Sequence, residues 1–199
     1  MGGEIVVRIQ TITTYADFLA IMEEYIPLLA DYLEWNFTGR YQHYPKMFVT
    51  NEGIIPPLDD VLAEPKRMRQ EHQLSKEWDQ KLRRDFTQGL WFFLAFVDGK
   101  LTGMMRLLRR NDREAELHSV YVDPSYRGLK IGTKLLESVI KTAREVQMEV
   151  IYLDTLPFME HAIKLYQNMG FEYVDYIDFP KYTRSSAKEF ETVFMERDL

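Results

Sequence analysis

Cysteine is absent from the 199-residue sequence, and its absence excludes several kinds of chemistry. Without thiols the chain forms no disulfide, binds no metal through thiolates and has no cysteine nucleophile that would carry a covalent acyl group. Histidine is also scarce, because the sequence contains only four and they are scattered. A metal site is therefore not expected.

Long hydrophobic runs and an excess of positive charge are missing as well. The longest apolar run, residues 90–97, is far too short to span a bilayer, and no apolar signal segment opens the sequence. The formal net charge of -6 argues against general nucleic-acid binding, which usually requires a basic face. We expect a cytoplasmic protein that binds neither membranes nor nucleic acid.

The apolar content that is present supports one well-packed core. Hydrophobic residues make up 46% of the sequence, and 199 residues are enough for a single domain over 1–199. Inside it we expect an irregular and helical insertion at about 36–88. Residues 36–57 lack a hydrophobic period, and residues 58–86 are strongly charged and are read as helices.

Hydrophobic periodicity predicts an α/β protein in which strands and helices follow one another. The expected strands are 5–12, 90–97, 101–108, 115–122, 150–154, 171–177 and 190–195. The expected helices begin at Tyr15, where Pro27 should kink or split the helix, and continue with 58–86, 131–144 and a helix between Pro157 and Gly170. Asp98-Gly99 predicts a tight hairpin. The strand–helix–strand order after residue 115 predicts one parallel pair, with ligands beyond its carboxyl ends.

The stretch from Leu117 to Ile140 joins a strand to a helix through a turn that contains Gly128 and Gly132. The first turn of a helix has unpaired N–H groups and a positive dipole end, and glycines there let phosphates approach the backbone. The turn is neither a nucleotide P-loop nor a dinucleotide fingerprint, because Thr133 and Lys130 stand where those motifs need glycine. Glycines placed for packing alone are the alternative.

This turn resembles the loop that binds the coenzyme A pyrophosphate in the GCN5-related N-acetyltransferase (GNAT) superfamily. That loop has Gln or Arg, two residues, Gly, one residue, and Gly or Ala. Arg127, Ile131 and Gly132 fit it, whereas Lys130 stands where the family usually has glycine. The resemblance implies these contacts with coenzyme A: Val120, Tyr121, Val122, Arg127, Gly128, Leu129, Lys130, Ile131, Gly132 and Thr133.

A second stretch, A-I-K-L-Y-Q-N-M-G-F from Ala162 to Phe171, is similar to the family signature A-x-x-L-Y-x-x-x-G-F. The family often has asparagine three residues before this alanine, and here that residue is Met159. The order of elements also matches the family across the chain. The resemblance implies a GNAT-like fold with a mixed, mostly antiparallel central sheet and helices on both faces.

The resemblance also implies catalytic roles. Family members with tyrosine at the position of Tyr166 use it as the general acid for the leaving thiolate. His118, nine residues before Arg127, resembles a histidine base of some members, and its titration range suits that task. Strand alternation puts Glu116 on the same face as His118. The residue pattern alone leaves open a core tyrosine, a structural histidine and a solvated glutamate.

The implied reaction is transfer of an acetyl group from acetyl-coenzyme A to a primary amine, by direct attack in a ternary complex. The acceptor would be a small-molecule or peptide amine, held by the first helices, residues 36–57 and the loop around Tyr182. A non-catalytic sensor or interaction module that binds coenzyme A is the alternative function. A homodimer through the final strands is possible, since strand edges favour pairing.

Overall fold

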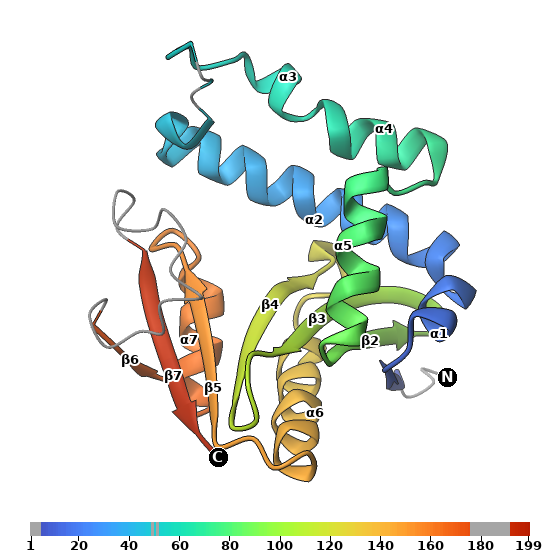
Figure 1. The fold of residues 1–199 in the computed structure, drawn as a ribbon, viewed down its shortest axis with the longest axis vertical. Coiled ribbons are helices and arrows are strands. Elements are labelled where there is room, and N and C mark those ends of the chain that lie inside the picture. Colours follow the sequence, from blue (N-terminus) through green and yellow to red (C-terminus); the bar gives the residue numbers. More distant parts are fainter. Residues whose placement is uncertain (1–4, 49, 51, 176–191) are drawn as a thin grey trace.

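The computed structural model describes residues 5–48, 50, 52–175 and 192–199, and its centre is one mixed sheet (Figure 1). Within these residues the sheet has seven strands in the order β1-β2-β3-β4-β5-β7-β6. All neighbouring pairs are antiparallel except β4 and β5, which are parallel as the crossover predicted. The strands are β1 Val7–Ile12, β2 Leu90–Val97, β3 Lys100–Arg109, β4 Glu114–Val122, β5 Val150–Thr155, β6 Glu172–Tyr173 and β7 Val193–Asp198.

Helices cover both faces of this sheet (Figure 1). The helices are α1 Tyr15–Ala20, α2 Met22–His43, α3 Leu58–Val61, α4 Ala63–Glu71, α5 Lys76–Thr87, α6 Ile131–Glu145 and α7 Glu160–Asn168, with short 3₁₀ turns at Pro45–Phe48 and Pro124–Tyr126. Helices α6 and α7 lie behind the sheet as drawn, α5 lies in front of it, and α2 crosses its upper edge.

Strand β2 shows how the sequence builds a core on each face. Phe93 and Ala95 pack in a cluster with α6, whereas Phe92 and Leu94 pack in a second cluster with α2 and α5. Successive side chains of a strand point to opposite faces, so a continuous apolar run buries both. The hairpin that follows has Asp98 and Gly99 both at positive φ, as a tight turn of this sequence requires.

Strands β4 and β5 pair only at one end. Their parallel register runs from Glu114↔Val150 to Glu116↔Tyr152, and β4 then continues to Val122 without pairing β5. The register between β3 and β4 shifts after Met104, and Ser119 has φ 49°, so β4 carries a bulge there. The sheet therefore opens at its centre, with one edge of β4 unpaired along the opening.

Two helical expectations were wrong in detail. The first helical region breaks at Ile21 and not at Pro27, which lies inside α2. Helix α2 tolerates Pro27 because Tyr25, Ile26 and Leu28 around it are buried in the core, and burial outweighs one lost hydrogen bond. Residues 36–43 were expected to be irregular, but they continue α2 to His43.

The C-terminal expectations hold only in part. Strand β6 is shorter than expected, and β7 begins at Val193 and runs to Asp198, beyond the predicted end at residue 195. Pairing of β7 with both β5 and β6 fixes this register, which the apolar pattern did not specify. The expected loop with Pro180, Tyr182 and Arg184 lies outside the described residues.

Candidate active site

A cavity of about 850 Å³ opens between the carboxyl-terminal half of α2, the unpaired part of β4, the turn before α6 and the start of α7. Its lining residues from β4 and the turn are Val120, Tyr121, Val122, Tyr126, Arg127, Gly128, Lys130, Ile131, Gly132 and Thr133. Its lining residues from α2 and the α7 region are Trp35, Thr38, Gly39, Gln42, His43, Phe158, Met159, Glu160, His161, Ala162 and Leu165. Every residue of the expected cofactor-binding set except Leu129 therefore lines one cavity.

The turn before α6 offers a row of free amides to this cavity. The backbone N–H of Arg127 bonds to Pro124, and the next bonded one is that of Lys134, which bonds to Lys130. Among the described residues no carbonyl or side chain accepts from the amides of Gly128 to Thr133. Consecutive free amides at a helix start, with the positive end of the dipole, form an anion site.

The backbone conformation of Lys130 bears on the absence of the usual glycine at this position. Its φ of 56° lies in the left-handed region, where a glycine carries no steric penalty and a lysine does. Lys130 thus adopts a backbone conformation that a glycine would adopt without strain. Gly128, with φ 87°, provides a second left-handed residue.

Residues 36–43 were expected on the acceptor side, but their helical form in the cavity wall was not predicted from the sequence. His43 stacks on Phe158 with ring centroids 4.6 Å apart and an interplanar angle of 11°. Gly39 permits this approach, because a Cβ there would lie 2.8 Å from a Phe158 ring carbon. The expected irregularity of 36–57 concealed the helical spacing that puts Trp35, Gly39 and His43 along one wall.

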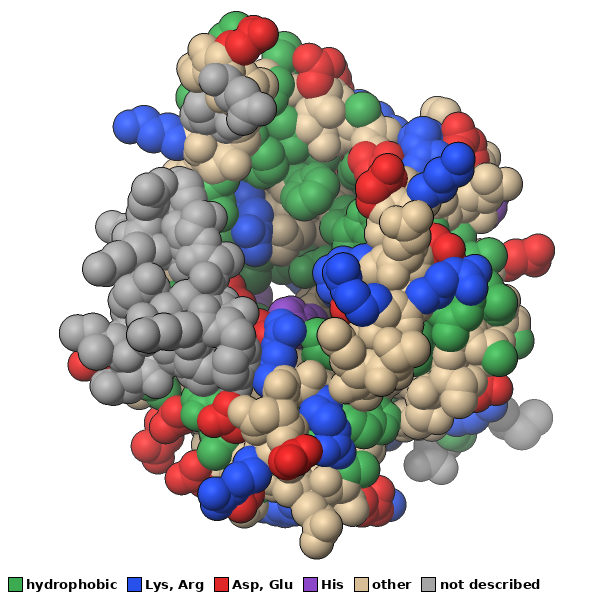
Figure 2. Space-filling view, viewed as in Figure 1, with side chains coloured by type: hydrophobic (Ala, Val, Ile, Leu, Met, Phe, Trp, Pro, Cys, Tyr) green, Lys and Arg blue, Asp and Glu red, His purple; other side chains and the backbone are tan. Residues whose placement is uncertain are grey.

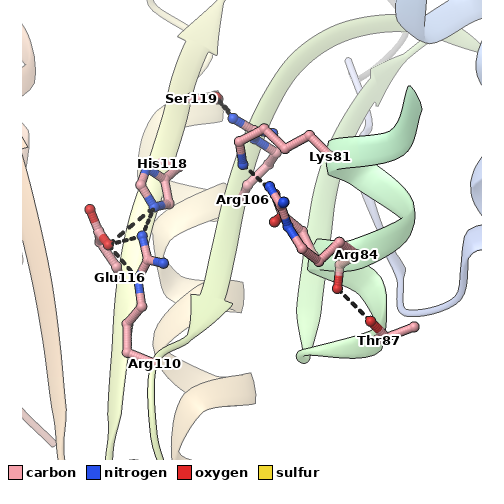
Figure 3. Close-up of polar contacts among 9 residues, drawn as sticks. Lys81, Arg84, Thr87, Arg106, Arg110, Glu116, His118 and Ser119 are labelled. Atoms are coloured by element: carbon pink, nitrogen blue, oxygen red, sulfur yellow. Dashed lines mark hydrogen bonds and ion pairs between the residues drawn. The ribbon is translucent and has the colours of Figure 1, made fainter. Parts of the chain in front are cut away.

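Glu116 and His118 meet on the face of β4 toward α5, together with Arg110 from the end of β3 (Figure 3). The Arg110 guanidinium donates to Glu116 Oε2 from Nε at 2.5 Å and also forms an ion pair with it through Nη2. His118 Nε2 lies 3.3 Å from the same carboxylate oxygen and 3.1 Å from Arg110 Nη2. The predicted shared face of Glu116 and His118 is confirmed, and Arg110 was missed.

The surroundings shift the pKa values of Glu116 and Asp154 in opposite directions. Burial alone would raise the pKa of Glu116, but the hydrogen bonds and charges of His118 and Arg110 outweigh it and lower that pKa below its ordinary value. Burial and the charge of Glu116 raise the pKa of Asp154 on β5. Asp154 is therefore the carboxyl group of this pair that more readily holds a proton.

Tyr166 lies one helical turn after Ala162, which lines the cavity, but it is not itself a lining residue. Its side chain is 4% exposed and packs against the ring of Phe171. Burial, Tyr32 and Asp154 raise the pKa of Tyr166, so the phenol keeps its proton at neutral pH. Tyr32 of α2 and Asp154 are polar neighbours that sequence reasoning missed.

The sequence profile of the acetyltransferase (GNAT) family matches residues 56–171. The chain belongs to this family. Among curated relatives of this GNAT protein, the uncharacterized N-acetyltransferase YjgM of Escherichia coli is 39% identical over 61 residues, which are 31% of this chain and 36% of YjgM. The N-alpha-acetyltransferase RimI of Mycobacterium tuberculosis is 38% identical over 72 residues, which are 36% of this chain and 44% of RimI. The match thus spans less than half of either relative.

Solved structures share the GNAT fold over nearly the whole chain. A GNAT acetyltransferase from Staphylococcus aureus has a TM-score of 0.64 at 24% identity, and the match covers 96% of this chain and 99% of that one. PaiA N-acetyltransferase from Thermoplasma acidophilum, in complex with coenzyme A, has a TM-score of 0.64 at 17% identity and covers 98% of this chain and 99% of its own. The predicted fold class is confirmed.

Two further observations concern the described part of this GNAT chain. None of its helices there combines the length and apolar character needed to cross a bilayer. In the same residues, no group of three or more His, Asp or Glu side chains is arranged to hold a metal ion.

Because Gly128 and Lys130 are both left-handed, we expect unequal effects on stability from a substitution at each. Gly128→Ala should lower the free energy of unfolding by about 1–2 kcal/mol, because alanine at φ 87° is strained although no atom lies near its Cβ. Lys130→Gly should leave stability within about 1 kcal/mol, because relief of strain offsets the entropy that glycine adds to the unfolded chain. Urea unfolding measures both, and a loss on Lys130→Gly as large as that on Gly128→Ala would contradict the assignment.

Glu116 predicts a stability difference that depends on pH. Its pKa is lower in the folded protein than the ordinary 4.5, so its contribution is complete above about pH 4.5 and disappears as the pH falls through the lowered value. Glu116→Gln should destabilise the protein by about 3 kcal/mol at pH 7, because Arg110 loses its buried partner. The loss should shrink toward pH 3.

Unfolding by urea at several pH values checks this dependence on Glu116. Glu172→Gln, on the exposed edge strand β6, is the matched control and should change stability by less than about 0.5 kcal/mol at every pH. A loss for Glu116→Gln that stays constant from pH 7 to pH 3 would show that the ion pair is not its cause.

Proposed function

We propose that this GNAT protein transfers an acetyl group from acetyl-coenzyme A to a primary amine, within one complex of enzyme, donor and acceptor. The observation that carries the proposal is the row of free amides from Gly128 to Thr133 at the edge of the cavity. A diphosphate satisfies such amides, and coenzyme A is a diphosphate with a long arm. The likeness in fold to PaiA, which was solved with coenzyme A, supports the same choice.

The residues of the cavity fit this donor along its length. The amides from Gly128 to Thr133 would hold the pyrophosphate, and Arg127 would add a positive charge beside it. The unpaired edge of β4 at Val120 and Val122 would bond the amides of the arm, as an added strand does. The donor supplies a thioester carbonyl, which an N–H group at this edge would polarise.

The reaction then needs one base and one acid. The amine nitrogen attacks the thioester carbonyl carbon, a C–N bond forms, and the C–S bond breaks to release the thiolate. The proton of the amine would leave toward His118, directly or through water. In the tautomer whose Nε2–H donates to Glu116, neutral His118 keeps its Nδ1 lone pair to accept the proton, and protonated His118 retains the same partner.

The phenol of Tyr166 would give its proton to the leaving thiolate. Its raised pKa keeps it protonated before the reaction, and its burial near Tyr32 and Asp154 excludes water that would compete as a donor. A phenol is a weaker acid than a thiol. The transfer therefore requires the hydroxyl to lie close to the sulfur, and it follows the development of negative charge on the sulfur as the C–S bond breaks.

A panel of amines tests the function. Purified protein with acetyl-coenzyme A should release free coenzyme A only when a suitable amine is added, and mass spectrometry should find the acetylated amine. Calorimetry with coenzyme A alone should show one binding site per chain. Binding of coenzyme A without release for any amine would favour the alternative, a sensor that binds coenzyme A, and absence of binding would overturn both functions.

Tyr166→Phe tests the acid. The substitution should lower kcat by about 100-fold, because the thiolate loses its proton donor, while the affinity for coenzyme A stays unchanged. Tyr173→Phe removes a hydroxyl from an exposed ring on β6 and should leave kcat as it is. If both variants turn over acetyl-coenzyme A at the original rate, Tyr166 is a core residue and not the acid.

A further inference from the structure

A group of positive side chains lies beside the bulge of β4, on the face of the sheet toward α5. Lys81 and Arg84 point from α5 toward Arg106 of β3, and Arg106 points toward Ser119 (Figure 3). We call Lys81, Arg84 and Arg106 the basic cluster. Neither the reaction steps above nor the cavity for the donor uses it.

Arg106 is the unusual member, because its positive charge is buried. It is 7% exposed, and its Nε and Nη2 donate to the hydroxyl of Ser119 at 3.0 and 2.5 Å. Its guanidinium also lies 5.8 Å from the ring centroid of Phe92. Within the described part of the chain, no carboxylate forms an ion pair with it. A buried cation is costly unless an anion accompanies it, so an anion is the group that this position lacks.

Of the other two members, only Arg84 adds net positive charge. Lys81 forms an ion pair with Asp85, which is buried, and the two charges cancel. Arg84 is exposed, and its backbone carbonyl accepts from Thr87. No carboxylate among the described residues forms an ion pair with the guanidinium of Arg84. Among the described residues, the positive charges of Arg84 and Arg106 thus have no compensating carboxylate, in a protein whose net charge is -6.

The basic cluster adjoins the expected site of acetyl transfer. Ser119, which holds Arg106, directly precedes Val120 of the cavity lining and directly follows His118. The face in Figure 2 has a hollow at its centre, with histidine in it and Lys and Arg side chains on its rim. Because the donor cavity reaches β4 at Val120, an acceptor that enters from this face would meet the basic cluster and His118 together.

We propose that the acceptor amine carries an anionic group, a carboxylate or a phosphate, and that Arg106 and Arg84 bind this group while the amine faces His118. This inference rests on the proposed acetyl transfer and narrows its substrate class. Guanidinium groups suit both anions, because their N–H groups match pairs of anionic oxygens. Lys81 adds no net charge to the site, because Asp85 neutralises it.

Pairs of acceptors that differ only in the anionic group test the proposal. The pairs are 4-aminobutanoate with its carboxamide, phosphoethanolamine with ethanolamine, and a tetrapeptide with Glu or Gln as its second residue. The anionic group lies away from the reacting nitrogen in each, so the amine pKa changes little. We expect a kcat/KM at least about tenfold higher for the anionic member of the best pair, as a charged hydrogen bond provides.

Variants locate the preference on the protein. Arg84→Gln should reduce the ratio of kcat/KM between anionic and neutral acceptors several-fold, and Arg106→Gln should abolish it, while the KM for acetyl-coenzyme A stays unchanged in both. Arg106→Lys keeps the charge and should retain part of the preference. Arg83→Gln is the matched control, because Arg83 is on the same helix but pairs with Asp79, and its ratio should stay that of the original protein.

The outcomes separate this inference from the proposed function. Equal or better turnover of the neutral members overturns the anionic acceptor and leaves acetyl transfer intact. A preference for anions that survives both Arg84→Gln and Arg106→Gln also overturns the assignment. If no acceptor of the panel releases coenzyme A, the proposed function fails and the inference fails with it. Melting temperatures of all variants identify any loss that comes from misfolding of the Arg106 variants.

Discussion

The separation of β4 from β5 is the constraint on which the site depends. The two parallel strands share a register of only three residue pairs, ending at Glu116↔Tyr152. The bulge at Ser119 turns β4 away and leaves its edge without a partner. An unpaired strand edge inside a sheet is costly unless another chain of amides fills it. The cavity, the free amides of the turn before α6 and the contacts of Glu116 with Arg110 and His118 all lie around this opening.

Charge is distributed around the opening in two different ways. On the side of α6 the positive potential comes from backbone N–H groups and the helix dipole, which need no side chain and no desolvated charge. On the side of α5 it comes from guanidinium groups, and Arg106 among them is buried. The backbone N–H groups suit an anion that binds several consecutive amides. The guanidinium groups suit an anion that binds one or two side chains. Two different anionic ligands would explain both.

Much of this arrangement could be read from the sequence, and the exceptions have physical causes. Strand and helix periods located the sheet, Gly128 and Gly132 marked the turn before α6, and alternation put Glu116 with His118. Periodicity located the first part of α2 but missed residues 36–43, where the one buried residue is the polar Asn36. Arg106, Arg110 and Asp154 were missed because they come from different strands, and no local pattern records which side chains the sheet register brings together.

Lys130 shows that the backbone conformation of a motif can matter more than the identity of each residue. A lysine stands where the family usually has glycine. Lys130 nevertheless adopts the left-handed φ that favours glycine, and the amides on either side have no acceptor among the described residues. The steric cost of a side chain in that region is about 1–2 kcal/mol, which a fully packed helix such as α6 can absorb. What a diphosphate needs from this turn is the direction of its N–H groups, and that direction is set by φ and ψ, whichever side chain the residue carries.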